Sequence, residues 1–158
     1  MNFLEKDLSN IIFEIDNSIL NQRGLSINGI KKRELIIGNY GRADIVTFER
    51  YDKYDRINKE NDACITIYEL KQNEINWNTF HQIIRYYKGI KQYTIERGFN
   101  YDFKVVMIGK EISKDTDFIY LTDLFENIDI YTYEYKVDGL YFKQHFDYSL
   151  INKGWNIE

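Results

Sequence analysis

The sequence predicts a mixed α/β fold, which some definitions would class as α+β, with a central β-sheet flanked by helices. Two observations predict it. Helical apolar periodicity occurs near the amino terminus and again in the middle of the chain, and strand-like runs follow each of these segments. The 158 residues are 44% hydrophobic and 29% charged, as in ordinary globular proteins. We therefore expect one folded domain over residues 1–158.

The first half of the chain predicts a helix, a hairpin and a further strand. Apolar side chains recur at helical spacing over residues 3–20, and Gly24 follows the end of this segment. Two strand-like runs, 33–37 and 42–49, are separated by the turn-forming sequence Gly38-Asn39-Tyr40-Gly41, which predicts a hairpin. The polar residues 50–62 predict an exposed loop, and residues 63–71 predict the next strand.

The second half predicts a long helix, a short strand and a terminal hairpin. Helical periodicity over residues 74–97 is followed by Gly98, a candidate C′ residue. Residues 103–108 predict a buried strand, and residues 114–127 are compatible with another helix. Residues 128–137 and 140–146 predict a hairpin with a type I′ turn at Asp138-Gly139. The tyrosines along this hairpin alternate as on a half-exposed face: Tyr131, Tyr133, Tyr135 and Tyr141.

Three charged residues lie on strand faces that are otherwise apolar. Alternation along residues 63–71 places Glu69 and Lys71 on one face, and Asp44 shares the face of Val46 and Phe48 on the preceding strand. A buried carboxylate and a buried ammonium must be paired, metal-bound or located beside a cleft. If the two strands are neighbours, we expect Asp44 and Glu69 to converge, with Lys71 beside them.

Two carboxylates at one point supply the oxygen ligands that Mg²⁺ or Mn²⁺ prefers. A metal held in this way lowers the pKa of a bound water and neutralises phosphoryl oxygens, which is the chemistry of metal-assisted hydrolysis. Lys71 could orient or help deprotonate the attacking water, or stabilise the developing charge. A salt bridge between Glu69 and Lys71, with Asp44 accepting backbone hydrogen bonds, is the structural alternative.

The sequences Gly41-Arg42-Ala43-Asp44-Ile45-Val46 and Ile67-Tyr68-Glu69-Leu70-Lys71 resemble two motifs of the PD-(D/E)xK nucleases, Gly-x-x-Asp and hydrophobic-Glu-x-Lys. Gln82-Ile83-Ile84-Arg85-Tyr86 resembles the Gln-x-x-x-Tyr signature of RecB-type nucleases and of the archaeal and actinobacterial mismatch-specific endonucleases. The resemblance spans roughly the first 110 residues in motif order. Ala43 replaces the proline that gives the superfamily its name.

This resemblance implies a restriction-endonuclease-like core and a Mg²⁺- or Mn²⁺-dependent endo- or exodeoxyribonuclease that leaves a 5′-phosphate. It implies that Asp44 and Glu69 bind the metal and that the Leu70 carbonyl is a further ligand. Lys71 would be catalytic. An amino-terminal helix bearing a glutamate is also typical of these enzymes, and Glu5 lies nearer the apolar stripe of the predicted helix than Asp7 or Glu14 does. Glu5 would thus bind a second metal or act in the outer shell.

The candidate substrate-binding residues fall into two groups. On the predicted long helix, the resemblance implies that Gln82 and Tyr86 position the substrate strand or the lysine, and Arg85 belongs to a mainly basic stripe that could follow a phosphate backbone. Lys32, Arg33 and Arg42 lie around the predicted hairpin, where they could contact phosphate or simply be exposed. Nucleic acid, with DNA favoured, is the expected partner.

Composition limits the other possibilities. The net charge of −4 argues against a protein that coats nucleic acid through bulk charge. The sequence shows neither a signal peptide nor a membrane span, so we expect a cytoplasmic protein without a membrane partner. Two alternative functions are a non-catalytic nucleic-acid- or partner-binding module on the same scaffold, and an interaction protein with chance motifs. A homodimer would suit cleavage of duplex DNA.

Overall fold

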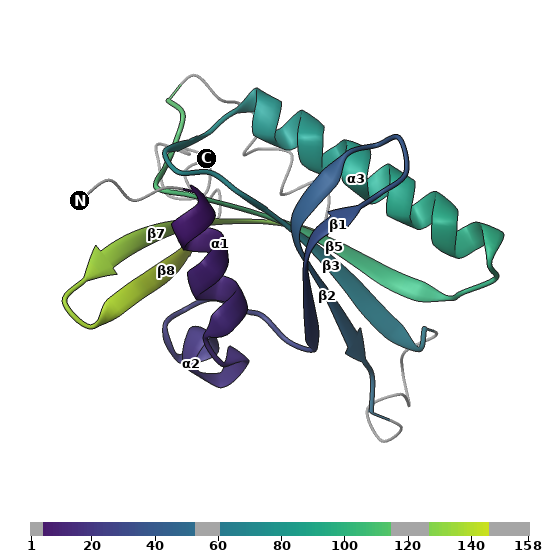
Figure 1. The fold of residues 1–158 in the computed structure, drawn as a ribbon, viewed down its shortest axis with the longest axis horizontal. Coiled ribbons are helices and arrows are strands. Elements are labelled where there is room, and N and C mark those ends of the chain that lie inside the picture. Colours follow the sequence, from purple (N-terminus) through teal and green to yellow (C-terminus); the bar gives the residue numbers. More distant parts are fainter. Residues whose placement is uncertain (1–4, 53–60, 115–126, 146–158) are drawn as a thin grey trace, which may run out of the picture.

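The computed structural model describes residues 5–52, 61–114 and 127–145. Its main strands are β1 (Ile30–Ile36), β2 (Arg42–Arg50), β3 (Ala63–Leu70), β5 (Tyr101–Gly109), β7 (Ile128–Lys136) and β8 (Gly139–His145). They form one sheet in the order β1-β2-β3-β5-β7-β8 (Figure 1). The central strands β3, β5 and β7 are parallel, and the pairs β1–β2, β2–β3 and β7–β8 are antiparallel. The predicted mixed α/β fold is confirmed.

Helices cover both faces of this sheet (Figure 1). On one face, α1 (Glu5–Glu14) and α2 (Asn17–Gln22) bury Leu8, Ile12 and Leu20 against β-strand side chains that include Tyr68. On the other face, α3 (Trp77–Glu96) packs Ile83 and its neighbours into a second apolar cluster. The sheet therefore separates two cores, and the ends of its strands are the places where polar side chains from both layers can meet.

The prediction of one helix over residues 3–20 is wrong, because the chain forms two helices. Asp16 precedes α2 with an extended ψ of 138°, which ends the helical path of α1. The Lys31 ammonium donates hydrogen bonds to the carbonyl oxygens of Ile12 at 2.9 Å and Ile15 at 2.5 Å. These acceptors lie in the last turn of α1 and just after it, where carbonyl groups have no partner within the helix. Apolar side chains before and after the break pack into the same core, so the apolar periodicity of the sequence did not indicate the break.

The long helix α3 starts three residues later than the predicted segment. The Asn76 side chain accepts hydrogen bonds from the backbone amides of Asn78 and Thr79, at 3.0 and 3.3 Å, and the Asn76 amide donates to the Thr79 hydroxyl. This capping box fixes the start of the helix. The preceding residues form β4 (Glu74–Ile75), which pairs with the unpredicted strand β6 (Glu111–Ile112). Gly98, with a φ of +69°, follows the helix as predicted.

Both predicted hairpins are present, but the turn type of the second is wrong. Val137 and Asp138 lie between the paired residues Lys136 and Gly139. A type I′ turn needs positive φ at both central residues. Among the described non-glycine residues only Glu34 has positive φ, so this turn type is excluded. The positive φ falls on Gly139 instead, because the β-branched side chain of Val137 disfavours that conformation.

Some predicted segments lie outside the described residues. These are most of the predicted helix over 114–127 and the middle of the predicted loop over 50–62. No helix in the described parts of the chain combines the length and the apolar character needed to cross a membrane.

Candidate functional site

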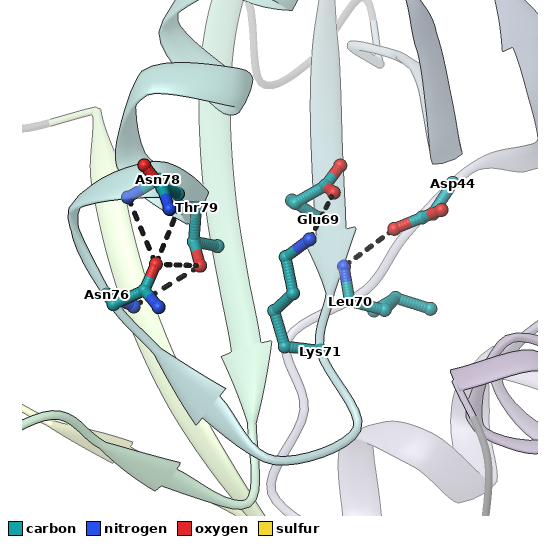
Figure 2. A network of polar contacts seen from close by, with 7 residues as sticks. All are labelled: Asp44, Glu69, Leu70, Lys71, Asn76, Asn78 and Thr79. Atoms are coloured by element: carbon teal, nitrogen blue, oxygen red, sulfur yellow. Dashed lines mark hydrogen bonds and ion pairs between the residues drawn. The ribbon is translucent and has the colours of Figure 1, made fainter.

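The two strands that carry the predicted carboxylates are antiparallel neighbours. Pairing of Ile45 with Tyr68 places Asp44 of β2 opposite Glu69 of β3, one residue further along the ladder. The Asp44 carboxylate accepts a hydrogen bond from the Leu70 amide, with a distance of 2.8 Å between Oδ2 and N. Figure 2 shows Asp44 reaching the end of β3 in this way. The two strands are therefore neighbours, as the prediction required.

Lys71, the residue that follows β3, completes the cluster. Its side chain points back toward Glu69, and Lys71 Nζ lies 3.4 Å from Glu69 Oε1 (Figure 2). The Lys71 amide is held by the Ile108 carbonyl of β5 at 2.8 Å. The Lys71 side chain is 23% exposed, so its ammonium sits at the border between the sheet interior and solvent.

The Glu69 carboxyl group is the most enclosed member of this cluster. Glu69 is only 4% exposed, and its Oε2 atom has no hydrogen-bond partner among the described residues. Burial, reinforced by the charge of Asp44, raises the pKa of Glu69 to about 8, although the Lys71 charge acts in the opposite direction. Burial also raises the pKa of Asp44, while the Leu70 amide lowers it. Both carboxyl groups would therefore gain from a cation that neutralises them in place.

The raised pKa of Glu69 predicts how the stability of the metal-free protein changes with pH. The folded chain binds this proton more tightly than the unfolded chain, so the stabilisation is complete below pH 4.5 and is lost as pH rises toward about 8. We expect the free energy of unfolding, measured by urea denaturation with a chelator, to fall by a few kcal/mol across this range. Glu69→Gln should remove most of that slope, and equal slopes in the two proteins would contradict the assignment.

Glu5 approaches the cluster from the other layer of the protein. It starts α1 and, together with Asp44, lines a polar cleft of about 370 Å³. Its charge contributes to the raised pKa of both Asp44 and Glu69. The structure thus brings Asp44, Glu69 and Lys71 together, and Glu5 acts on the two carboxyl groups through its charge. The interpretation of the motifs as chance predicts that Asp44, Glu69 and Lys71 do not converge.

The donor set fits a divalent cation bound with the help of water and substrate. In the described ranges, no group of three or more His, Cys, Asp or Glu side chains is arranged to hold a metal ion. Mg²⁺ typically uses one or two protein carboxylates and keeps several waters. Two neighbouring carboxyl groups and the peptide carbonyl of Leu70 match this pattern. The buried Oε2 atom of Glu69 is an acceptor for which the described residues supply no donor.

Gly41, from the Gly-x-x-Asp sequence, and Tyr86, from the Gln-x-x-x-Tyr sequence, pack against each other. A Cβ atom on Gly41 would lie 2.6 Å from Cε1 of the Tyr86 ring, so only glycine leaves room for this ring. Gly41 also has a φ of +126°, which side chains rarely tolerate. Tyr86 is 8% exposed, and burial together with the charges of Glu69 and Asp44 raises its pKa. Tyr86 therefore packs against Gly41, three residues before Asp44.

The other predicted substrate-binding residues are distributed unevenly around the cluster. Arg33 lines the same cleft as Asp44, and Arg42 is exposed two residues before Asp44 on β2. Arg85 is exposed on α3, and Gln82 Oε1 is buried without a hydrogen-bond partner in the described part of the chain. Lys32 instead lines a different, mainly apolar groove of about 740 Å³ between the β1–β2 hairpin and α3.

Tyr133 is a neighbour of the site that the sequence did not indicate. Its hydroxyl group donates a hydrogen bond to the Gln72 carbonyl, directly after Lys71. Burial, together with the nearby charge of Glu5, raises the pKa of Tyr133. Tyr131 and Tyr133 are buried rather than half-exposed, because their side of the sheet is covered by α1 and α2. The sequence shows regular alternation along the hairpin, but it does not show that α1 and α2 cover one of its faces.

Comparisons of the chain with protein-family models, with curated proteins and with solved structures give no match.

Proposed function

We propose that this protein is a metal-dependent nuclease that hydrolyses phosphodiester bonds of DNA and leaves a 5′-phosphate. One observation carries the proposal: the buried Glu69 has an oxygen without a hydrogen-bond partner among the residues that the structure describes, and it lies beside a second carboxylate from the neighbouring strand and beside a lysine. Burying two carboxyl groups together is unfavourable unless a cation or a proton compensates them. Perturbed acidic groups at a cleft are typical of catalytic sites.

Asp44 and Glu69 would hold a Mg²⁺ or Mn²⁺ ion, with the Leu70 carbonyl and Glu5 as further donors. When bound, such an ion supplies a water of lowered pKa and neutralises charge on the phosphoryl oxygens. The hydrogen bond from the Leu70 amide fixes the Asp44 carboxylate against the end of β3. Glu69 is fixed by its burial in the sheet layer.

Lys71 acts from the solvent side of the cluster. Its ammonium lies 3.4 Å from Glu69, and its side chain is partly exposed, so it is accessible to a phosphate or a water bound beside Glu69. A cation in this place stabilises negative charge that develops on the phosphate during hydrolysis. The exposed Arg42 and Arg85 would attract the DNA backbone even though the chain carries a net charge of −4. A cytoplasmic location is part of the same proposal.

The test is a cleavage assay with the purified chain, Mg²⁺ or Mn²⁺, and single-stranded, duplex, branched and mismatched DNA, with RNA in parallel. We expect cleavage of at least one DNA, with 5′-phosphate ends, and no cleavage when a chelator is present. Specific DNA binding without any cleavage would instead favour the non-catalytic binding module. Absence of both binding and cleavage with every nucleic acid would contradict the proposal.

A further inference from the structure

The polar cleft beside Asp44 lies between two elements that belong to different parts of the fold. Its walls are one face of α1, which contributes Glu5, Lys6, Ser9 and Asn10, and the strand β1, which contributes Arg33 and Glu34. Two cations, Lys6 and Arg33, therefore share the cleft with the carboxyl groups of Glu5, Glu34 and Asp44, which the metal ion would partly neutralise. The volume of about 370 Å³ falls within the range of small-ligand sites. A group that occupied the cleft would touch the same aspartate that we assign to the metal.

Arg33 is a cation of this cleft that makes two contacts with α1. Its Nη1 atom donates a hydrogen bond to Asn10 Oδ1 at 2.9 Å, and its guanidinium lies over the Phe13 ring, 4.6 Å from the ring centre. Two contacts on α1 thus orient a group that has five N–H donors, of which this hydrogen bond uses one. A pre-oriented guanidinium is well suited to binding a phosphate through two parallel hydrogen bonds.

The neighbouring residues distinguish Arg33 from the other cations of β1. Lys31 donates to the carbonyls at the end of α1, and Lys32 lines the apolar groove on the other side of the hairpin. Glu34 lies between Arg33 and Leu35, which pair with Ile45 and Ala43 on either side of Asp44. It has a φ of +53°, a strained conformation for a residue with a side chain. Strained backbone of this kind is concentrated at functional sites.

We infer that the cleft between α1 and β1 binds a backbone phosphate of the DNA strand next to the bond that is cut, with Arg33 as the phosphate-binding residue. This inference rests on the proposed nuclease function. It specifies the path of the substrate, which passes from the Asp44–Glu69 cluster along α1. Lys6 adds a second cation to the same wall, and Asn10 is a positioning residue that acts through Arg33.

The test measures binding of fluorescently labelled single-stranded and duplex DNA to Arg33→Ala in Ca²⁺ at several salt concentrations. We expect affinity to fall about tenfold or more, and the slope of log affinity against log salt to become shallower by about one unit. Arg33→Lys keeps the charge but not the planar guanidinium, so its affinity for DNA should lie between that of the wild-type protein and that of Arg33→Ala. Arg97→Ala is the matched control, because this guanidinium also lies over an aromatic ring, that of Tyr93, near the far end of α3.

Different results would overturn the two proposals. If wild-type protein cleaves DNA and Arg33→Ala binds with unchanged affinity and salt slope, the cleft does not hold a phosphate while the nuclease function stands. If Arg97→Ala weakens binding as much as Arg33→Ala, the effect is general charge and the inference is wrong. If wild-type protein neither binds nor cleaves any nucleic acid, both proposals fail.

Discussion

Replacement of Lys71 by alanine is expected to lower the rate of DNA cleavage by about 10²–10⁴-fold without unfolding the protein. The substitution removes the partly exposed cation that lies 3.4 Å from Glu69. The backbone of residue 71 remains held by the Ile108 carbonyl, and the side chain lost was only partly buried. Cleavage rates at saturating DNA and thermal unfolding followed by circular dichroism measure the two effects separately.

Lys104→Ala is the control for this variant. Lys104 lies on β5 and pairs with Asp129 at 2.6 Å, so it is also a partly exposed strand lysine with a carboxylate partner. Its removal should leave the cleavage rate within about twofold of the wild-type rate, because Lys104 pairs with Asp129 and not with Glu69. The fold should persist as well, since a partly exposed ion pair contributes only about 1 kcal/mol or less to stability. Cleavage retained by Lys71→Ala would remove Lys71 from the mechanism.

Gly41→Ala is expected to destabilise the protein by about 3 kcal/mol or more. The new methyl group would lie 2.6 Å from the Tyr86 ring, in a backbone conformation with a φ of +126°. The buried ring belongs to α3, so relief of the clash would move the helix or the start of β2. We therefore expect weaker metal binding as well, because Asp44 follows three residues later. Chemical denaturation measures the first effect, and calorimetry the second.

Gly38→Ala separates strain from the clash in the same turn. Gly38 also has a positive φ, of +48°, but a Cβ atom there would meet nothing within 4 Å. We expect this variant to lose only about 1 kcal/mol, the ordinary cost of placing alanine in the left-handed region. Equal losses in the two variants would show that the Tyr86 contact does not matter.

The convergence of the carboxylates could be predicted because side chains alternate along a strand. The alternation is broken beside Asp44, where Ala43 and Val46 pack in one core and Ile45 packs in the other. Asp44 and Glu69 interrupted apolar faces, and the Gly38–Gly41 turn predicted the pairing of β1 with β2. That β2 and β3, which carry the two carboxylates, are neighbours was only a condition of the prediction, and the structure shows it. Packing of the long helix was likewise visible in its periodicity. These features depend on local sequence, and the structure reproduces them.

What could not be predicted depends on contacts between distant segments. The break after α1 is stabilised by Lys31 from the next strand, and Tyr133 reaches Gln72 across the sheet. Glu34 adopts a positive φ, and nothing in the neighbouring sequence predicts this conformation for a glutamate. The role of Gly41 in making space for Tyr86 required the packing of α3 against the hairpin. Sequence patterns carry no information on such partners until the topology is known.

Titration of Mn²⁺ into the metal-free protein, followed by calorimetry, tests most directly whether Asp44 and Glu69 form a metal site. The wild-type protein should show saturable binding, and Asp44→Asn, which keeps an acceptor for the Leu70 amide, should bind at least about tenfold more weakly. Wild-type protein that takes up no Mn²⁺, or an Asp44→Asn variant that binds it with unchanged affinity, would contradict the account.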